Sequence, residues 1–163
     1  MEHVDPEIDD RLFRNVMGSF ATGVTVITTK VAEEVHGMTA NAFMSISLNP
    51  KLVAISIAEN AKMLQHIKDV RQFAINILST DQQQISKQFS GQLHLKSEIT
   101  FGSYKGLPVL EESLAIVTCV LHSEFVAGDH TIFIGHVTGV KLEEKAPLLY
   151  SQGKYRELKE LEG

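Results

Sequence analysis

The sequence predicts a mainly β, antiparallel fold, either a barrel or a sandwich, with short α-helices. Period-two alternation and β-branched residues indicate about six strands, whereas helical spacing supports only about three or four short helices. Most strands are joined by hairpin-length connections and not by long helices. A doubly wound parallel sheet is therefore disfavoured, because it requires helical crossovers.

The N-terminal third begins with a helix that Asp9 or Asp10 can cap. Its apolar residues recur at helical spacing: Leu12, Phe13, Val16, Met17 and Phe20. A strand over 22–29 then leads to a hairpin tip at Glu33–Glu34 and returns toward Thr39. Beyond Thr39, up to Pro50, the pattern loses its period and predicts an ordered loop or a bulged strand.

The middle of the chain predicts strands over 52–58 and 73–78, each followed by a short helix. Asn60 can cap the first helix. The apolar residues on the buried side of that helix are Met63, Leu64, Ile67 and Val70. The second helix covers 81–89 and carries Ile85 and Phe89.

The segment 91–108 is polar and contains glycine, so we expect an irregular surface excursion. Two long strands follow, over 114–125 and 131–142. Residues 127–130 join them as a hairpin turn, because Gly128 and Asp129 accept the backbone angles that such a turn needs.

The chain ends with residues 147–155 and a charged helical tail over 155–161. At 163 residues it fits a single domain over 1–163 that needs no disulfide to close its core. Within that domain we expect residues 1–8 to be flexible and 156–163 to form a C-terminal tail.

The composition of the sequence disfavours several classes of function. The net charge is −5 and no Lys/Arg cluster occurs, which disfavours nucleic-acid binding. No run of about eighteen apolar residues occurs and no signal peptide begins the sequence, so we expect a cytoplasmic protein without a membrane segment. The single cysteine, Cys119, agrees with a reducing compartment and lies in a run typical of a buried strand. Core packing is favoured for it over a nucleophilic role.

Several catalytic signatures are absent. The sequence contains no G-x-G-x-x-G, P-loop, H-E-x-x-H, C-x-x-C or G-x-S-x-G motif. His122 and His136 fall on the two long strands and could face each other, but two histidines on a sheet more often bind no metal. An enzyme with this sequence would therefore use an organic cofactor and not a metal.

Residues 36–50 interleave small hydroxyl and amide side chains with apolar ones and contain almost no charge. Such a strip can bind a flat, mostly apolar ligand with a polar edge, because hydroxyls, amides and backbone N–H groups donate to ring carbonyls and phosphates. A small-residue strand packed closely on another strand explains the composition equally well.

The runs "FRNVMGSFATGVTVITT" and "HGMTANAFMSISLNPKLVAISI" resemble the short-chain flavin reductases of the FMN-binding split-barrel fold. Within that family they are similar to the small reductase components of two-component phenol and 4-hydroxyphenylacetate monooxygenases. The resemblance continues through "FAINIL", "QFSGQ", "GLPVL", "GDHTIFIGHV" and "PLLYSQGKY", and so spans Arg11 to Tyr155. It implies a six-stranded Greek-key split β-barrel that forms a homodimer. It also implies an enzyme that reduces flavin with NADH and releases it to a separate oxygenase.

The resemblance also implies roles for individual residues. Thr39, Ala40 and Asn41 are expected at the flavin ring. The residues expected along the ribityl chain and phosphate are Ser45, Ser47, Ser56, Ile57 and Lys62. Phe89, Ser90 and Gly91 match the segment near the phosphate or adenine end, and His130 and Tyr155 match positions near the nicotinamide nucleotide.

Most of these residues have an ordinary structural alternative. Ser56 fits the outward face of a half-buried strand, and Lys62 fits an exposed helix position. Phe89 fits the core, His130 fits a turn, and Tyr155 fits an anchor for the C-terminal tail. Each role therefore stays open on sequence alone.

The implied reaction needs little acid–base catalysis from the protein, because the two cofactors carry the chemistry and the protein aligns them. The absence of an arginine cluster favours NADH over NADPH, although Arg156 stands beside Tyr155. The resemblance favours FAD over FMN. The competing functions are a flavin-binding electron carrier, an enzyme like pyridoxamine-phosphate oxidase, and a dimeric small-ligand sensor.

Overall fold

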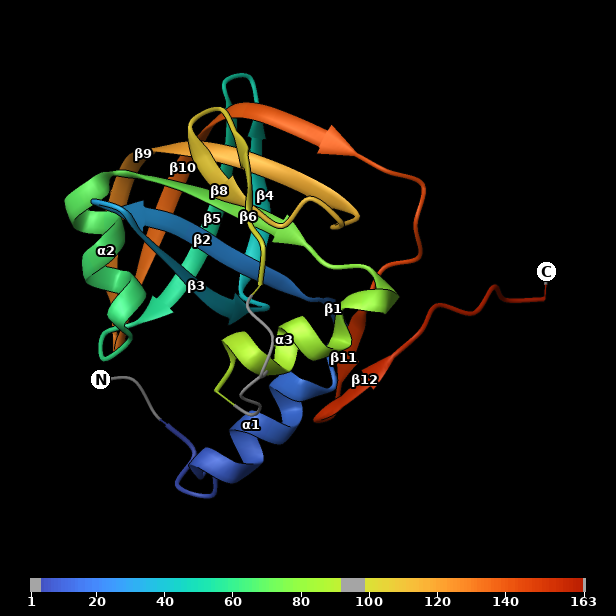
Figure 1. Cartoon of the computed structure of the whole chain (residues 1–163). Coiled ribbons are helices and arrows are strands. Elements are labelled where there is room, and N and C mark those ends of the chain that lie inside the picture. The colour runs from blue at the N-terminus through green and yellow to red at the C-terminus, as the bar shows by residue number, and fades with distance from the viewer. Residues whose placement is uncertain (1–3, 92–98, 163) are drawn as a thin grey trace.

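A computed structural model describes residues 4–91 and 99–162 of the chain. Its main element is a seven-stranded sheet in which every pairing is antiparallel and the strand order is β3-β2-β6-β9-β10-β5-β4 (Figure 1). The strands are β2 (Thr25–Val31), β3 (Glu34–Ala40), β4 (Phe43–Leu48), β5 (Lys51–Ala58), β6 (Gln72–Ile77), β9 (Ala115–Ala127) and β10 (His130–Leu142). The expected mainly β, antiparallel class is confirmed.

The two edges of this sheet, β3 and β4, are consecutive in the chain and are connected by Asn41 and Ala42. Within the described residues they do not pair with each other, so the sheet does not close into a barrel. The seventh strand is β4, which occupies the segment expected to be a loop or a bulged strand, and its register shifts between Ser45 and Ser47. The bulged strand is confirmed, whereas the six-stranded Greek-key barrel is not.

In the described part of the chain, four short helical elements accompany the sheet: α1 (Asp10–Gly18), α2 (Lys62–Val70), the 3₁₀-helix η1 (Thr80–Gln82) and α3 (Gln83–Phe89). Asp9 caps α1 as expected, accepting a hydrogen bond from the backbone N–H of Leu12 at 2.7 Å. The cap expected at Asn60 is wrong. Helix α2 begins one residue later, with Ala61 at the N-cap and no side-chain cap.

Two small sheets complete the fold over residues 4–91 and 99–162. One has the order β1-β11-β12, from β1 (Thr22–Gly23), β11 (Leu149–Ser151) and β12 (Lys154–Arg156). The other is the hairpin of β7 (Gly102–Tyr104) and β8 (Leu107–Val109). In the view of Figure 1, α1, α3 and the β1-β11-β12 sheet lie below the main sheet, and α2 lies at its left.

Two expectations for the C-terminal half are wrong. Part of the supposed irregular excursion is the β7–β8 hairpin, whose turn holds Lys105 and Gly106 at φ of 52° and 79°, and whose Leu107 and Val109 are buried. Residues 92–98 of that segment lie outside the described part. The expected helical tail is also absent, because residues 157–162 form neither helix nor strand.

The largest core cluster fills the space between the sheet and α2, with Ile67, Phe73 and Phe133 fully buried. The buried amide of Asn76 is satisfied on both ends. It donates to the Val26 carbonyl at 2.9 Å and accepts from the Leu110 N–H at 2.8 Å, so it ties β2 and β6 to the segment after β8.

Cys119 lies in the same core, as expected, and burial raises the pKa of its thiol to about 12. The two histidines of the long hairpin do not stand opposite each other, since the register pairs His136 with Val120. Among the described helices, none has the length and apolar character needed to cross a membrane.

Candidate functional site

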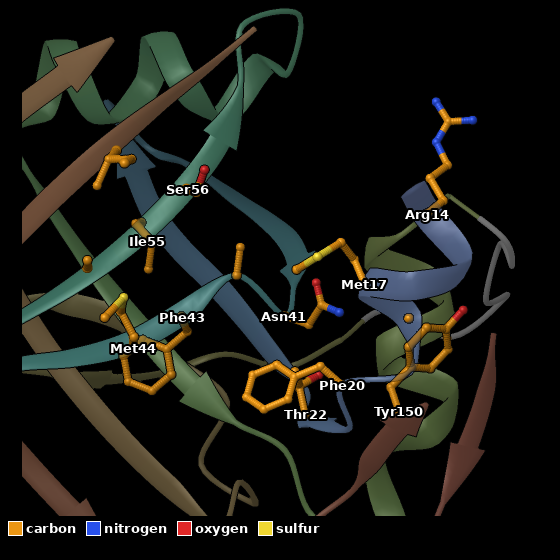
Figure 2. A pocket seen from close by; sticks show the side chains of 14 residues that line it. Arg14, Met17, Phe20, Thr22, Asn41, Phe43, Met44, Ile55, Ser56 and Tyr150 are labelled. Atoms are coloured by element: carbon orange, nitrogen blue, oxygen red, sulfur yellow. The ribbon is translucent and has the colours of Figure 1, made fainter. Parts of the chain in front are cut away.

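A cavity of about 560 Å³ opens between α1, the start of β4 and the middle of β5 (Figure 2). Most of its wall is apolar, with Met17, Phe20 and Phe43 among the lining side chains. The polar groups on the wall are few: Arg14, Thr22, Asn41, Ser56 and the phenol of Tyr150. This combination suits a flat, largely apolar ligand with a polar edge.

The corner between β3 and β4 forms part of this wall and is fixed by hydrogen bonds from three neighbouring elements. The Thr25 hydroxyl donates to the Ala40 carbonyl at 2.7 Å, and the Ser56 N–H donates to the Ala42 carbonyl at 3.1 Å. The Thr39 hydroxyl donates to the Ser86 carbonyl of α3 at 2.7 Å. Asn41 therefore sits on a rigid corner with its side chain exposed at the cavity.

A second, smaller cavity of about 180 Å³ adjoins this corner on the side of α3 and β12. Among its lining residues are Thr39, Ser86, Ser90 and Tyr155. The Ser86 and Tyr155 hydroxyls form a hydrogen bond of 2.8 Å, which links α3 to β12. Its wall is thus richer in hydroxyl groups than the wall of the larger cavity.

The structure brings together six of the residues singled out from the sequence. Asn41 and Ser56 line the larger cavity. Around the smaller cavity lie Thr39, Ala40, Asn41, Ser90 and Tyr155. Of the three residues expected at the flavin ring, Asn41 alone reaches the larger cavity.

Ser45, Ser47, Ile57 and Lys62 do not line either cavity. Ser45 and Ser47 flank the bulge of β4, where Ser45 is exposed and Ser47 is half-buried. Lys62 is exposed at the first residue of α2. Ile57 is buried in the core, and its backbone is opposite Thr131 in the sheet.

Phe89, Gly91 and His130 also lie outside the cavity walls. The Phe89 ring packs on Gly37, where a Cβ would come within 2.6 Å of its Cε1, so this ring is a packing element between α3 and β3. Gly91 ends the described segment at a φ of 79°. His130 lies at the start of β10 and makes a 2.7 Å contact with the Asp129 carboxylate.

Among the described residues, the groups with shifted pKa values do not line either cavity. The hydrogen bond with His130 and the charge of that ring lower the pKa of Asp129. The pKa of His66, on α2, is lowered by burial and by His36. The described cavity walls carry apolar and hydrogen-bonding groups, which suits a reaction whose chemistry resides in bound cofactors.

Sequence reasoning singled out only Asn41 and Ser56 of the residues that line the larger cavity, and four of those it missed contribute large side chains. Arg14, Met17 and Phe20 come from α1 and the turn after it, and Tyr150 comes from β11. The signal for the α1 residues was present, because Met17 and Phe20 belong to its apolar stripe. For Tyr150 no local pattern distinguishes it from Tyr155, and only the pairing of β11 with β1 places it at the cavity.

A flavin fits this set of groups. Its fused ring is flat and mostly apolar, and its polar edge requires donors such as the Asn41 amide and the Ser56 hydroxyl. The buried hydroxyl oxygen of Thr22, in the same wall, has no hydrogen-bond partner among the described residues. A ligand with polar edge atoms would supply the hydrogen-bond partner that the Thr22 hydroxyl lacks.

Comparison with known proteins gives a consistent result. An NADH-dependent flavin reductase from a Rhodococcus species is 39% identical over 158 residues, covering 95% of this chain and 90% of the relative. The reductase component of 4-hydroxyphenylacetate 3-monooxygenase from Thermus thermophilus is 40% identical over 147 residues, with 90% and 95% covered.

Among solved structures, flavin reductase PheA2 is 56% identical with a TM-score of 0.92, over 94% of this chain and 100% of that one. The oxidoreductase SgcE6 of Streptomyces globisporus, in complex with NAD and FAD fragments, is 34% identical with a TM-score of 0.85, over 98% of both chains. The family of flavin reductase-like domains matches residues 17–159. The chain therefore belongs to the flavin reductase-like domain family.

Proposed function

We propose that this chain acts as a single-domain, NADH-dependent flavin reductase that supplies reduced flavin to a separate monooxygenase component. The observation that carries the proposal is the pair of adjoining cavities, one mainly apolar and one hydroxyl-rich, in a chain with this family membership. Relatives named as an FAD reductase and as an FMN reductase are 35% and 36% identical, so either flavin is a candidate. FAD is the first choice, since a neighbouring structure contains FAD fragments.

In this proposal the flavin ring lies in the larger cavity, against Asn41 and Thr22, and the ribityl chain runs past Ser56. Bound flavin would supply the electron-accepting ring, and NADH the electrons. The protein binds and orients both ligands and excludes water with apolar side chains such as Met17 and Phe20.

The nucleotide part of NADH would lie along the smaller cavity, beside Tyr155 and Ser90. His130 would meet the nucleotide from the β9–β10 turn, with its ring orientation fixed by Asp129. The remaining expected contacts, from Ser45, Ser47, Ile57, Lys62, Phe89 and Gly91, concern the ribityl chain, phosphate and adenine of the flavin. They require the ligand to extend beyond the described cavities.

We also propose a homodimer whose interface includes α1. The apolar stripe of this helix is exposed along its length, and its Met17 and the nearby Phe20 line the larger cavity. A second copy packed on the stripe would cover apolar surface and close the cavity on that side.

The test is NADH oxidation by the purified chain, followed at the nicotinamide absorbance band with added FAD or FMN. Oxidation that requires added flavin is the expected result. Tight flavin binding without turnover would instead support an electron carrier. A chain with neither activity nor bound flavin would contradict the proposal.

A single substitution tests the nucleotide role of His130. We expect His130→Ala to raise the Michaelis constant for NADH about three- to tenfold, the effect of one lost hydrogen bond, with the constant for flavin unchanged. His122→Ala is the matched control, because His122 is exposed on the same hairpin and its ring forms a 3.1 Å hydrogen bond with the neighbouring Ser123. Equal constants in the two variants would remove His130 from the site.

A further inference from the structure

Tyr150 occupies the middle strand of the small β1-β11-β12 sheet. Its backbone is opposite Thr22 of β1 on one side and opposite Tyr155 of β12 on the other. Because β11 is held along both edges, the base of this side chain has little freedom to move.

The ring of Tyr150 stands where the two cavities meet. Of the described residues, Asn41 and Tyr150 alone line both the 560 Å³ and the 180 Å³ cavity. Asn41 contributes an amide from the β3–β4 corner, whereas Tyr150 contributes the larger surface, an aromatic ring with a hydroxyl. Figure 2 shows this ring at the border of the group of lining side chains, with its hydroxyl directed away from Phe20 and Thr22.

A chain of contacts fixes the orientation of the ring. It packs edge-on against Tyr155, with centroids 5.4 Å apart and an interplanar angle of 69°. Tyr155 is itself held by its 2.8 Å hydrogen bond with Ser86, and the Ser86 carbonyl accepts from Thr39. Within the described residues the Tyr155 hydroxyl is thus bonded to the protein, while that of Tyr150 has no such hydrogen bond and is free for a ligand.

We propose that Tyr150 is the side chain that contacts both ligands, the flavin in the larger cavity and the nicotinamide nucleotide in the smaller one, and so sets their relative position. This proposal rests on the proposed function and adds to it a residue that touches both substrates. A ring fixed at the junction orders two flat ligands at little entropic cost, because it is already held before they bind.

The experiment measures binding and turnover separately in Tyr150→Ala, Tyr150→Phe and the control Tyr104→Phe. Tyr104 lies on β7, donates to the Val140 carbonyl at 3.2 Å and lines neither cavity. Fluorescence titration gives the dissociation constant for FAD, and calorimetric titration of the FAD-loaded protein gives that for NAD⁺. The thermal midpoint of each variant reports whether it folds, and Tyr150→Leu, which keeps apolar bulk, replaces the alanine variant if that one does not fold.

In Tyr150→Ala we expect both dissociation constants to rise about fivefold or more, and kcat at saturating substrates to fall about tenfold. Tyr150→Phe is expected to keep FAD affinity within about twofold, since the ring remains, and Tyr104→Phe to match the wild type. A change in one ligand's affinity alone, or in neither, would overturn the assignment while leaving the reductase function intact. A wild-type chain that binds neither FAD nor NAD⁺ would reject the function and the role of Tyr150 together.

Discussion

Helices α1 and α2 have the same length, nine residues each, and both carry an apolar stripe, yet they meet opposite environments. In α2 the stripe packs on the sheet, and Ile67 has an exposed fraction of 0%. In α1 no residue is buried, and Val16 remains 59% exposed. An amphipathic pattern therefore predicts that a helix has an apolar face. It does not predict whether that face packs against its own chain, a ligand or a second copy of the chain.

The largest expected difference between the two helices is in stability. Ile67→Ala should lower the free energy of unfolding by about 2–5 kcal/mol, because it leaves a cavity in a fully buried site. The matched change Val16→Ala in α1 should alter that free energy by no more than about 0.5 kcal/mol. Urea denaturation of dilute protein measures both. Similar losses in the two variants would mean that the α1 stripe packs within its own chain.

A substitution on the α1 stripe should instead weaken association between copies. We expect Phe13→Ser to raise the dimer dissociation constant about tenfold, since Phe13 is 58% exposed in the single chain and apolar. Phe125→Ser is the control, because Phe125 is equally exposed but lies on β9 near the far hairpin turn. Analytical ultracentrifugation measures the constant. A wild-type chain that is monomeric at high concentration would contradict the dimer.

The smallest expected effect is on the pH dependence of stability, and it involves His66 of α2. His66 stacks on His36 of β3, with ring centroids 3.9 Å apart. Burial, the charge of His36 and, more weakly, that of Lys62 lower the pKa of His66, and the carboxylates of Asp69 and Glu34 offset only part of this. The unfolded chain therefore binds a proton on this histidine more readily than the folded chain does.

The sign of the pH effect follows from that difference. The free energy of unfolding should fall as pH drops through the unfolded pKa of about 6.5 toward the lower folded value. His66→Gln should show a smaller decrease in the thermal midpoint between about pH 8 and about pH 5.5 than the wild type. The exposed His122 provides a control, and an equal decrease in His66→Gln and His122→Gln would refute the role of the stack.

Much of the fold could be predicted because its signals are local. The β9–β10 hairpin follows from alternation and from Gly128 in a left-handed conformation at a φ of 61°. The bulge of β4 follows from the broken period after Thr39. The β7–β8 hairpin was missed, although Lys105–Gly106 is an ordinary two-residue turn, because its short strands lie in a polar segment.

The site was harder to predict, because its residues converge through long-range pairing. Asn41 and Ser56 were anticipated from a resemblance, and the structure places both at one cavity. Tyr150 was not, because its position depends on β11 pairing with β1, more than a hundred residues earlier in the chain. Physical periodicity alone carries no information about such a partner.

The burial of Cys119 has a consequence for oxidative damage. Its thiol is shielded in the core and stays protonated, with a pKa of about 12, so the form that oxidants attack is scarce. Met17 and Met44 at the larger cavity are 54% and 59% exposed. An oxidant produced beside a reduced flavin would therefore convert these thioethers to sulfoxides first. Oxidative damage would then begin at the ligand site, while the core stayed intact.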